Sequence, residues 1–476
     1  MGETRENRLG TQSVGRLLIG MSLPLMVSMF VQALYNIVDG IYVAQISENA
    51  LTATSLAFPA QMLMVSVALG TGAGVSSLLS RRLGAKDFKG ANDCANNGLL
   101  LAAGAFIVFM LFGIFFSRSW LEMFTDDTEL IQLGTDYLSI CLTYSVGVFF
   151  AILGERLLQA TGHAGLSMVS QLAGAIVNIV FDPILIFGRY GFPEMGIRGA
   201  AIATVAGQMT SMVLALVLNH LKNHEIQFSF KNMLPEWGTI KEIYRVGVPV
   251  MVLNALGSVM NVGMNKIIIT FSSSAVAVFG AYYKLNSFIF MPVFGLVQGL
   301  VPIVGYNYGA RRPDRIMRAV KLSIIAAVSI MIVGMLLFLI FPAQLLGLFK
   351  AGPEMLSIGT RALRIIGVTF PLAAIGIVMS NMFQGIGIGT VSLINSFLRQ
   401  IIVLLPSAYI LASTLGLDYV WYSFVIAEII SFLYTLIMYK RIYDRRIKTL
   451  FDEIKYDEKI TEEFMSGALK LPGGEG

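Results

Sequence analysis

The sequence predicts an all-α integral membrane protein with about twelve transmembrane helices, arranged as two six-helix lobes. Composition, the spacing of apolar segments and an internal repeat support this fold class. Of the 476 residues, 56% are hydrophobic and 13% are charged, whereas a soluble domain carries about 25% charged residues. A soluble chain of this composition would expose large apolar patches and aggregate. The mean hydropathy of +0.73 instead agrees with side chains that face lipid.

The first half of the chain contains six apolar segments of roughly the 20 residues that one span requires. They cover residues 16–42, 51–79, 96–117, 134–158, 165–187 and 197–219. We expect residues 16–219 to form an N-lobe that follows a polar segment, 1–15, and precedes a polar linker, 220–245.

The second half repeats this organisation. Its predicted helices cover residues 246–271, 276–306, 319–341, 357–384, 391–412 and 418–440. We expect 246–440 to form a C-lobe and the charged segment 441–476 to be a tail.

Positive charge gathers in alternate connections. The basic residues of the two equivalent loops are Arg81, Arg82, Lys86 and Lys89, and Arg311, Arg312, Arg315 and Arg318. The connections 43–50 and 272–275 contain no Lys or Arg. The positive-inside rule then predicts a multi-pass protein of the cytoplasmic membrane with both termini and the linker in the cytoplasm.

Equivalent residues recur at an offset of 225 positions along most of both halves. The pairs are Pro24 and Pro249, Gly84-Ala85 and Gly309-Ala310, Gln159 and Gln384, Gly162 and Gly387, and Ser167 and Ser392. Because each repeat holds six helices, both halves have the same orientation and are related by a pseudo-two-fold axis along the membrane normal. This arrangement is typical of transporters whose two lobes rock about a central site.

Catalytic and metal-binding motifs are missing from the sequence. Cys94 and Cys141 support neither a disulfide framework nor a metal cluster. No HExxH, P-loop, GxSxG or paired CxxC pattern occurs. We therefore expect no enzymatic activity and no cofactor. The net charge of +5 resides in particular loops rather than on one face, so we expect no nucleic-acid partner.

Four polar residues are predicted to lie at similar depth within the membrane. Asp39 is in the outer half of the first helix, and Asn178 and Asp182 lie one turn apart in the fifth. Thr204 is about two turns from the outer end of the sixth. An ionisable group inside a bilayer costs about 2.5–3.5 kcal/mol on insertion scales, so it usually has a function. Their oxygens suit a small metal cation such as Na⁺, and two adjacent carboxylates equally suit a shared proton.

Other polar residues are weaker candidates. Glu155, near the inner end of the fourth helix, is a candidate for receiving a cationic substrate, with an interfacial ion pair or a loop carboxylate as the alternative. Tyr35 and Asn36, about one turn before Asp39, and Lys284 in the eighth helix are candidates for substrate binding or gating. A buried pair between Arg399 and Glu428 is expected to be structural.

Several of these motifs together resemble the multidrug and toxic compound extrusion (MATE) family. The matching residues are Pro24, Asp39, Gly84-Ala85, Gln159-Ala160-Thr161-Gly162, Asn178-Ile179-Val180-Phe181-Asp182-Pro183, and Gly199-Ala200-Ala201 with Thr204. The combination of an Asp in the first helix with Asn-x-x-x-Asp-Pro in the fifth is similar to the DinF-like and MepA-like bacterial branch. The resemblance covers essentially the whole chain.

The resemblance implies a secondary antiporter that exports lipophilic, often cationic drugs or metabolites in exchange for H⁺ or Na⁺. It further implies that Asp39, Asn178, Asp182 and Thr204 hold the coupling ion. We expect the partners to be such small molecules and membrane lipids, and the chain to act as a monomer. The alternative with the same fold is a flippase for lipid-linked oligosaccharides or other lipid precursors.

Overall fold

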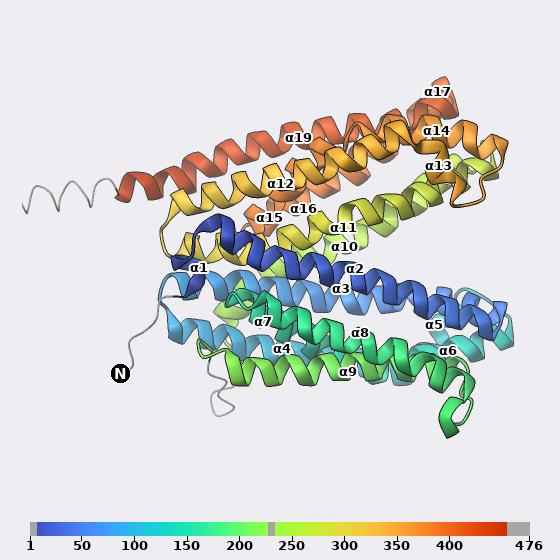
Figure 1. Cartoon of the computed structure of the whole chain (residues 1–476), viewed down its shortest axis with the longest axis horizontal. Coiled ribbons are helices and arrows are strands. Elements are labelled where there is room, and N and C mark those ends of the chain that lie inside the picture. The colour runs from blue at the N-terminus through green and yellow to red at the C-terminus, as the bar shows by residue number, and fades with distance from the viewer. Residues whose placement is uncertain (1–6, 227–233, 455–476) are drawn as a thin grey trace, which may run out of the picture.

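The computed structural model describes residues 7–226 and 234–454, and every regular element within these ranges is a helix (Figure 1). Residues 1–6, 227–233 and 455–476, which belong to the predicted N-terminal segment, linker and tail, lie outside the described residues. Ten described helices are long and apolar enough to cross a membrane, and two bent helix pairs bring the number of spans to twelve. The predicted twelve-helix membrane fold is therefore confirmed.

The N-lobe contains the first six spans. Its elements are α1 (Arg8–Thr11), α2 (Val14–Ile46), α3 (Glu48–Gly84), α4 (Phe88–Phe115), α5 (Ser117–Glu122), α6 (Thr128–Thr143), α7 (Val146–Ala160), α8 (Ala164–Phe187), the 3₁₀ turn η1 (Arg189–Gly191) and α9 (Ile197–Lys222). The helix pair α6 and α7 forms one span, and α1 and α5 are short connecting helices.

The C-lobe contains the other six spans. Its elements are α10 (Trp237–Ile268), α11 (Ser273–Gly309), α12 (Pro313–Ile340), α13 (Pro342–Gly347), α14 (Pro353–Gly367), α15 (Phe370–Gly385), α16 (Gly389–Phe397), the π-helix η3 (Leu398–Leu404), α17 (Leu405–Leu415), α18 (Leu417–Val420), α19 (Tyr422–Ile442) and the π-helix η4 (Tyr443–Ile447). The span from α16 to α17 therefore runs through a π-helical segment.

Two predicted helices, 134–158 and 357–384, are not continuous. The first bends by 45° between α6 and α7, and the second by 49° between α14 and α15. At each break the chain makes a tighter, 3₁₀-type bond: the Ser145 N–H donates to Leu142, and the Thr369 N–H donates to Ile366. Pro371, in the first turn of α15, adds to the second break because it lacks an N–H group.

The 225-residue repeat recurs in the backbone. Helices α3 and α11 begin and end at equivalent residues, and so do α4 and α12. The hydroxyl oxygens of Ser47 and Ser272 accept from the N–H groups of Ala50 and Ala275 and so cap α3 and α11 in the same way. Gly162 and its equivalent Gly387 both have left-handed backbone angles, with φ of 91° and 90°. Glycine is favoured at such a turn because it has no Cβ.

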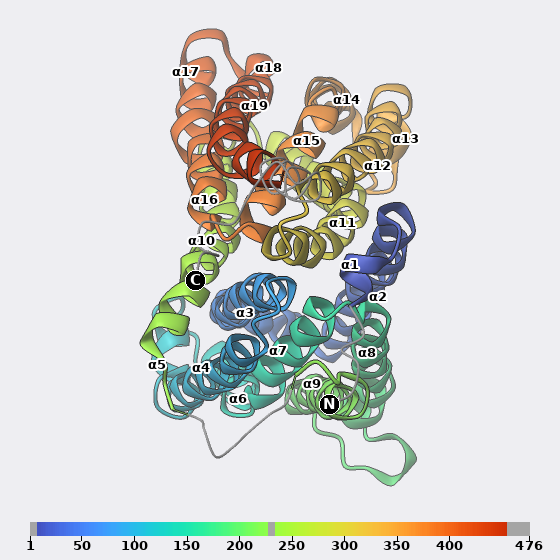
Figure 2. The same ribbon diagram turned by 90° about the vertical axis from the view of Figure 1, so that its left-hand side faces the viewer.

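The first helix of each lobe packs against the other lobe. Seen from one end of the molecule, α10 lies beside α3 on one side and α2 lies beside α11 on the opposite side (Figure 2). The Ser22 hydroxyl of α2 donates to the Leu296 carbonyl of α11 at 3.0 Å. This reciprocal arrangement is the expected pseudo-two-fold relation between the lobes.

The lobes meet at the end of the molecule where α1 lies. There the Ser77 hydroxyl of α3 donates to the Gln384 carbonyl of α15 at 2.6 Å. The described chain ends also lie at this end, and the ribbons of the two lobes diverge toward the opposite end, where α5 and α13 lie (Figure 1).

Helix α1 bridges the two lobes. On the N-lobe side, Asn7 donates to the carboxylate of Glu225 and to the Thr161 carbonyl. On the C-lobe side, the Arg315 guanidinium donates to the carbonyls of Leu9 and Gln12 at 3.1 and 2.7 Å. Gly10 packs closely against the Tyr306 ring. The segment therefore connects both lobes at the end where they already touch.

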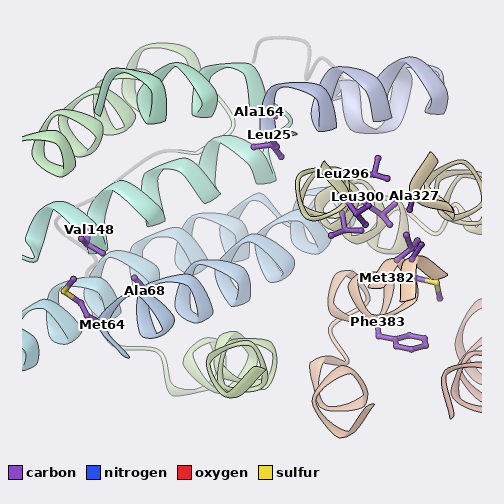
Figure 3. Packing of buried hydrophobic residues seen from close by; sticks show 14 of the residues in the cluster. Leu25, Met64, Ala68, Val148, Ala164, Leu296, Leu300, Ala327, Met382 and Phe383 are labelled. Carbon is purple, nitrogen blue, oxygen red and sulfur yellow. The ribbon is translucent and has the colours of Figure 1, made fainter. Parts of the chain in front are cut away.

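Apolar packing forms the interior of each lobe, while other large apolar side chains face outward. Figure 3 shows Met64 and Ala68 of α3 near Val148 of α7, and a second group around Leu296 and Leu300 of α11. On the outside, Ile19 and Ile437 are 65% and 63% exposed. Lipid can cover such side chains without cost, which water cannot.

Candidate functional site

A cavity of about 640 Å³ lies between the lobes. N-lobe residues from α2, α3, α7, α8 and α9 form one wall, and C-lobe residues from α10, α11, α15, α16, η3 and α19 form the other. Aliphatic side chains alternate with amides and hydroxyls, and the charged lining residues are Glu155, Arg156 and Arg399. This composition suits an amphipathic small molecule.

Three helices bring the four predicted ion-site residues together. Asn178 and Asp182 occupy successive turns of α8, and the Asn178 amide nitrogen lies 3.4 Å from both Asp182 Oδ1 and Thr204 Oγ1 of α9. With the amide rotated by half a turn, it instead donates to Asp182 Oδ2 and accepts from the Thr204 N–H, both at 3.3 Å. In either orientation Asn178 connects Asp182 with Thr204.

Asp39 of α2 completes this group. Its carboxyl group lies within hydrogen-bonding reach of the Asp182 carboxyl group. Asp182 is fully buried, and Asp39 Oδ1 is buried without a donor among the described residues. Neither residue forms an ion pair in the described part of the chain. Two charged carboxylates in this position would repel each other, so the pair requires a proton or another cation.

The carboxyl pair lies behind the wall of the cavity. Tyr35, Asn178 and Thr204 line the cavity, whereas Asp39 and Asp182 do not. A change in the charge of the pair therefore acts first on the side chains that form the wall. The helix that carries Asp182 continues through Pro183, which has no N–H and leaves the Ile179 carbonyl without its usual helical donor.

Three further residues near Asp39 were not predicted from the sequence. Gln61 of α3 lies within hydrogen-bonding reach of both Tyr137 and Cys141 of α6, and these two residues are close enough to Asp39 to interact with it electrostatically. Tyr137 and Cys141 lie on α6, just before the bend between α6 and α7, and the sequence of this span has no proline that would predict the bend. The one signal in the sequence is the polar Gln61 in the middle of an apolar helix.

Glu155 of α7 is held by hydrogen bonds. Its carboxylate accepts from Gln171 of α8 at 2.8 Å and from Ser211 of α9 at 3.0 Å. The predicted alternative, an ion pair with Arg156, does not form, because the Arg156 guanidinium donates to Gln159 at 3.0 Å. Glu155 is therefore an acidic group on the cavity wall with no neutralising partner within the described residues.

The remaining candidates from the sequence differ in whether their side chains line the cavity. Tyr35 lines the cavity, but Asn36 is exposed and does not. Lys284 is also outside the cavity, with its ammonium 5.9 Å from the centre of the Phe349 ring. Arg399 lines the C-lobe wall and donates to Glu428 at 3.3 Å, which confirms the expected pair.

Comparison with known proteins agrees with this architecture. The MatE family model matches residues 24–184 and 249–410, one match in each lobe. The multidrug export protein MepA of Staphylococcus haemolyticus is 26% identical over 430 residues, which cover 90% of this chain and 94% of the relative. An FAD transporter of Shewanella oneidensis is 26% identical over 401 residues, covering 83% of this chain and 87% of the relative.

Solved structures share the whole fold. A multidrug resistance MATE family transporter in an outward-facing conformation has a TM-score of 0.86 and 28% identity, covering 95% of this chain and all of the other. A MATE crystal structure in the bent conformation has a TM-score of 0.87 and 27% identity, covering 94% and 99%. Because the family model spans more than half of the chain and both lobes match, this chain belongs to the MatE family of multi-pass membrane transporters.

Proposed function

We propose that the chain is a secondary antiporter that exports lipophilic, cationic drugs or metabolites in exchange for protons. The observation that carries the proposal is the contact between the Asp39 and Asp182 carboxyl groups beside the cavity. The similarity to MepA multidrug export proteins supports the kind of cargo.

The carboxyl contact favours a proton over Na⁺ as the coupling ion. One proton held between two carboxyl oxygens forms a hydrogen bond and removes their repulsion, so the two groups titrate as a pair. Na⁺ would use the same donors, namely the oxygens of Asp39, Asn178, Asp182 and Thr204, but it would hold the carboxylates apart on either side of the ion. The contact between the two carboxyl groups therefore supports the proton, which is the smaller of the two ligands.

Coupling follows from the place of the pair between α2 and α8. Helix α2 carries Asp39 and also packs against α11 of the opposite lobe. Proton binding strengthens the link from α2 to α8, and proton loss weakens it, so the two protonation states favour different positions of α2. The proton drives transport only if its affinity differs between the outward-open and inward-open states.

The orientation of the chain gives the conformational state. We place both termini in the cytoplasm of a bacterial cell and the protein in its cytoplasmic membrane, as the positive-inside rule favours. The end where the lobes meet is then cytoplasmic, and the structure corresponds to the outward-facing state. The TM-score of 0.86 with an outward-facing MATE family transporter supports this assignment.

Glu155 and Tyr35 supply the chemistry for a lipophilic cation. Glu155 offers a carboxylate to a positive group, and the Tyr35 ring offers an aromatic face. The Glu155→Gln variant is expected to raise the KM for ethidium at least tenfold, while Glu122→Gln, which changes a surface ion pair, leaves it unchanged.

The direct test is ethidium efflux from proteoliposomes under a pH gradient alone, and then under a Na⁺ gradient alone. The proposal predicts efflux with the pH gradient and none above background with the Na⁺ gradient. Efflux driven only by Na⁺ would leave antiport standing but assign the four-residue site to Na⁺. If neither gradient drives ethidium or another lipophilic cation, the proposed function is wrong.

An anionic metabolite is a second candidate cargo. The Arg156 guanidinium faces the cavity and bonds to the neutral Gln159 rather than to a carboxylate. A relative of similar identity is an FAD transporter. If anionic cargo is carried, Arg156→Gln abolishes transport of a flavin nucleotide in the same proteoliposomes and leaves ethidium efflux intact.

A further inference from the structure

A second pocket, of about 290 Å³, lies outside the central cavity at the α1 end of the C-lobe. Its lining residues are Ile388, Val391, Met438, Arg441, Ile442, Arg445 and Arg446. Four of these are apolar and three are arginines. The pocket lies between the start of the span that begins with α16 and the end of α19 and η4.

The three arginines are available for an anion. None of them forms an ion pair with a carboxylate within the described residues, although Asp444 lies on the same turn. Within the described ranges, the Arg446 guanidinium donates to the neutral phenol of Tyr308, at 3.4 Å. Arg441, Arg445 and Arg446 are all exposed.

Helical spacing brings these side chains to one pocket, and the helix ends there in the π-helical turn η4. In this turn the Lys448 N–H donates to the Tyr443 carbonyl, five residues earlier. The five lining residues from this helix follow the i, i+3, i+4, i+7, i+8 spacing that lies on one helical face; they are Met438, Arg441, Ile442, Arg445 and Arg446. The π-turn lies at the end of this face and carries Arg445 and Arg446. Such turns occur frequently at functional sites.

The pocket lies at the depth of lipid headgroups. Met438 belongs to the apolar part of α19, and the charged segment begins at Lys440. Tyr439 and Tyr443 pack together with ring centres 5.9 Å apart, beside the arginines. Paired tyrosines at the end of a span are typical of the membrane–water boundary. The apolar side of the pocket therefore adjoins lipid tails, and the arginines adjoin their phosphate groups.

We propose that this arginine pocket binds the headgroup of one anionic phospholipid. Basic pockets between transmembrane helices at the cytoplasmic side are sites for such headgroups. Arginine can hold a phosphate through two parallel hydrogen bonds. The four apolar side chains receive the first carbons of the acyl chains, which distinguishes a lipid from a free phosphate ion. The proposal is independent of the transported substrate and of the coupling ion.

The test compares three full-length proteins in nanodiscs with phosphatidylcholine alone or with added phosphatidylglycerol. The pocket variant is R441Q/R445Q/R446Q. The matched control is K89Q/K440Q/K448Q, which removes the same charge from exposed basic positions outside the pocket. Binding of pyrene-labelled phosphatidylglycerol and the number of lipids retained in native mass spectrometry are measured for each.

The expected result is a roughly hundredfold weaker affinity for phosphatidylglycerol in the pocket variant, which equals about 1 kcal/mol for each arginine. The control retains the affinity of the wild type, and one tightly retained lipid is lost only from the pocket variant. An equal loss of affinity in both variants would show that general surface charge causes the binding, and would overturn the proposal. Competition by millimolar inorganic phosphate would also overturn it, because the site would then not need a lipid.

A measurement on the wild type covers the case in which the pocket variant does not fold. Phosphatidylglycerol with a photoactivatable headgroup is cross-linked to the protein, and the labelled peptides are mapped. The proposal predicts labelling concentrated in residues 388–391 and 438–446. Labelling spread evenly over all basic loops at this end would contradict it.

Discussion

Gly84 and Gly309 occupy equivalent positions and meet the opposite lobe in the same way. A methyl group at Gly84 would overlap the Tyr306 carbonyl oxygen, and a methyl group at Gly309 would overlap the Arg81 carbonyl oxygen. Tyr306 and Arg81 are themselves equivalent in the 225-residue repeat. The last turns of α3 and α11 therefore form a close backbone contact near the pseudo-two-fold axis. Only residues without a side chain permit this approach.

Substitution of these glycines should open the contact. Gly309→Ala is expected to cost about 1–3 kcal/mol in the closed contact, the usual range for overpacking, and so to favour the state in which this end is open. Labelling of a cysteine placed at Ser76, on the cavity wall, by a membrane-impermeant reagent added from this side checks this. Gly280→Ala, on the same helix with open space around it, should not change the labelling rate. An unchanged rate in Gly309→Ala would show that the contact does not hold the end closed.

Removal of the α1 bridge should act in the same direction. Arg315→Ala deletes hydrogen bonds to Leu9, Gln12 and Asn307, each worth about 0.5–1.5 kcal/mol and more when one group is charged. We expect at least a tenfold faster labelling of the Ser76 position from the α1 end. Arg318→Ala, an exposed neighbour with the same charge, serves as the control. Equal labelling rates in the two variants would mean that α1 does not stabilise the closed end.

Substitution of Thr204 should weaken the affinity for the coupling ion without abolishing transport. Thr204→Val removes the hydroxyl that lies 3.4 Å from the Asn178 amide and keeps the shape of the side chain. The loss of one such interaction, about 1 kcal/mol, predicts a fivefold to tenfold weaker coupling-ion affinity. Thr210→Val in the same helix is matched, because the Thr210 hydroxyl bonds only to the Ala206 carbonyl of its own helix. The apparent ion affinity for efflux is measured in proteoliposomes, and equal values for both variants would separate Thr204 from the site.

The Arg399–Glu428 pair should stabilise the fold, and the effects of substituting its two members on stability should be strongly non-additive. Arg399→Met leaves Glu428 in the interior without a partner, and breaking a buried pair costs about 3–5 kcal/mol. Because the Arg399 side chain is 30% exposed, we expect the lower end, about 3 kcal/mol. The double variant with Glu428→Leu should recover most of the thermal stability of the wild type, since no charge is left unpaired. A double variant as unstable as Arg399→Met would contradict this reading.

The sequence predicted the spans and the common depth of Asp39, Asn178, Asp182 and Thr204 for the same reason, while their role in binding an ion stays a prediction. Long apolar segments and loop charges give each helix its direction, and direction gives the depth of Asp39, Asn178, Asp182 and Thr204. Equal depth in the membrane was enough to bring these four side chains together, because α2, α8 and α9 are adjacent in the lobe.

Features that depend on helix rotation and bending were not predicted. The span that carries Tyr137 and Cys141 bends by 45° between α6 and α7, and 134–158 contains no proline that would indicate this bend. Asn36 is only three residues before Asp39, yet it faces outward. The arginine pocket also needs Ile388 and Val391 from the start of a span about fifty residues earlier in the chain, and the sequence does not show that the two segments are adjacent. Such features arise from packing between helices, which a linear pattern does not contain.

In the proposed mechanism, a proton held by the Asp39–Asp182 pair is exchanged for substrate. The most direct measurement is proton release by the purified protein in weakly buffered detergent solution when tetraphenylphosphonium is added. We expect the wild type to release about one proton per bound cation, and so should Asp136→Asn, a surface control at a carboxylate that pairs with Arg198. Asp39→Asn and Asp182→Asn should release none, provided that both still bind the cation. Undiminished proton release from these two variants would show that the carboxyl pair does not carry the exchanged proton.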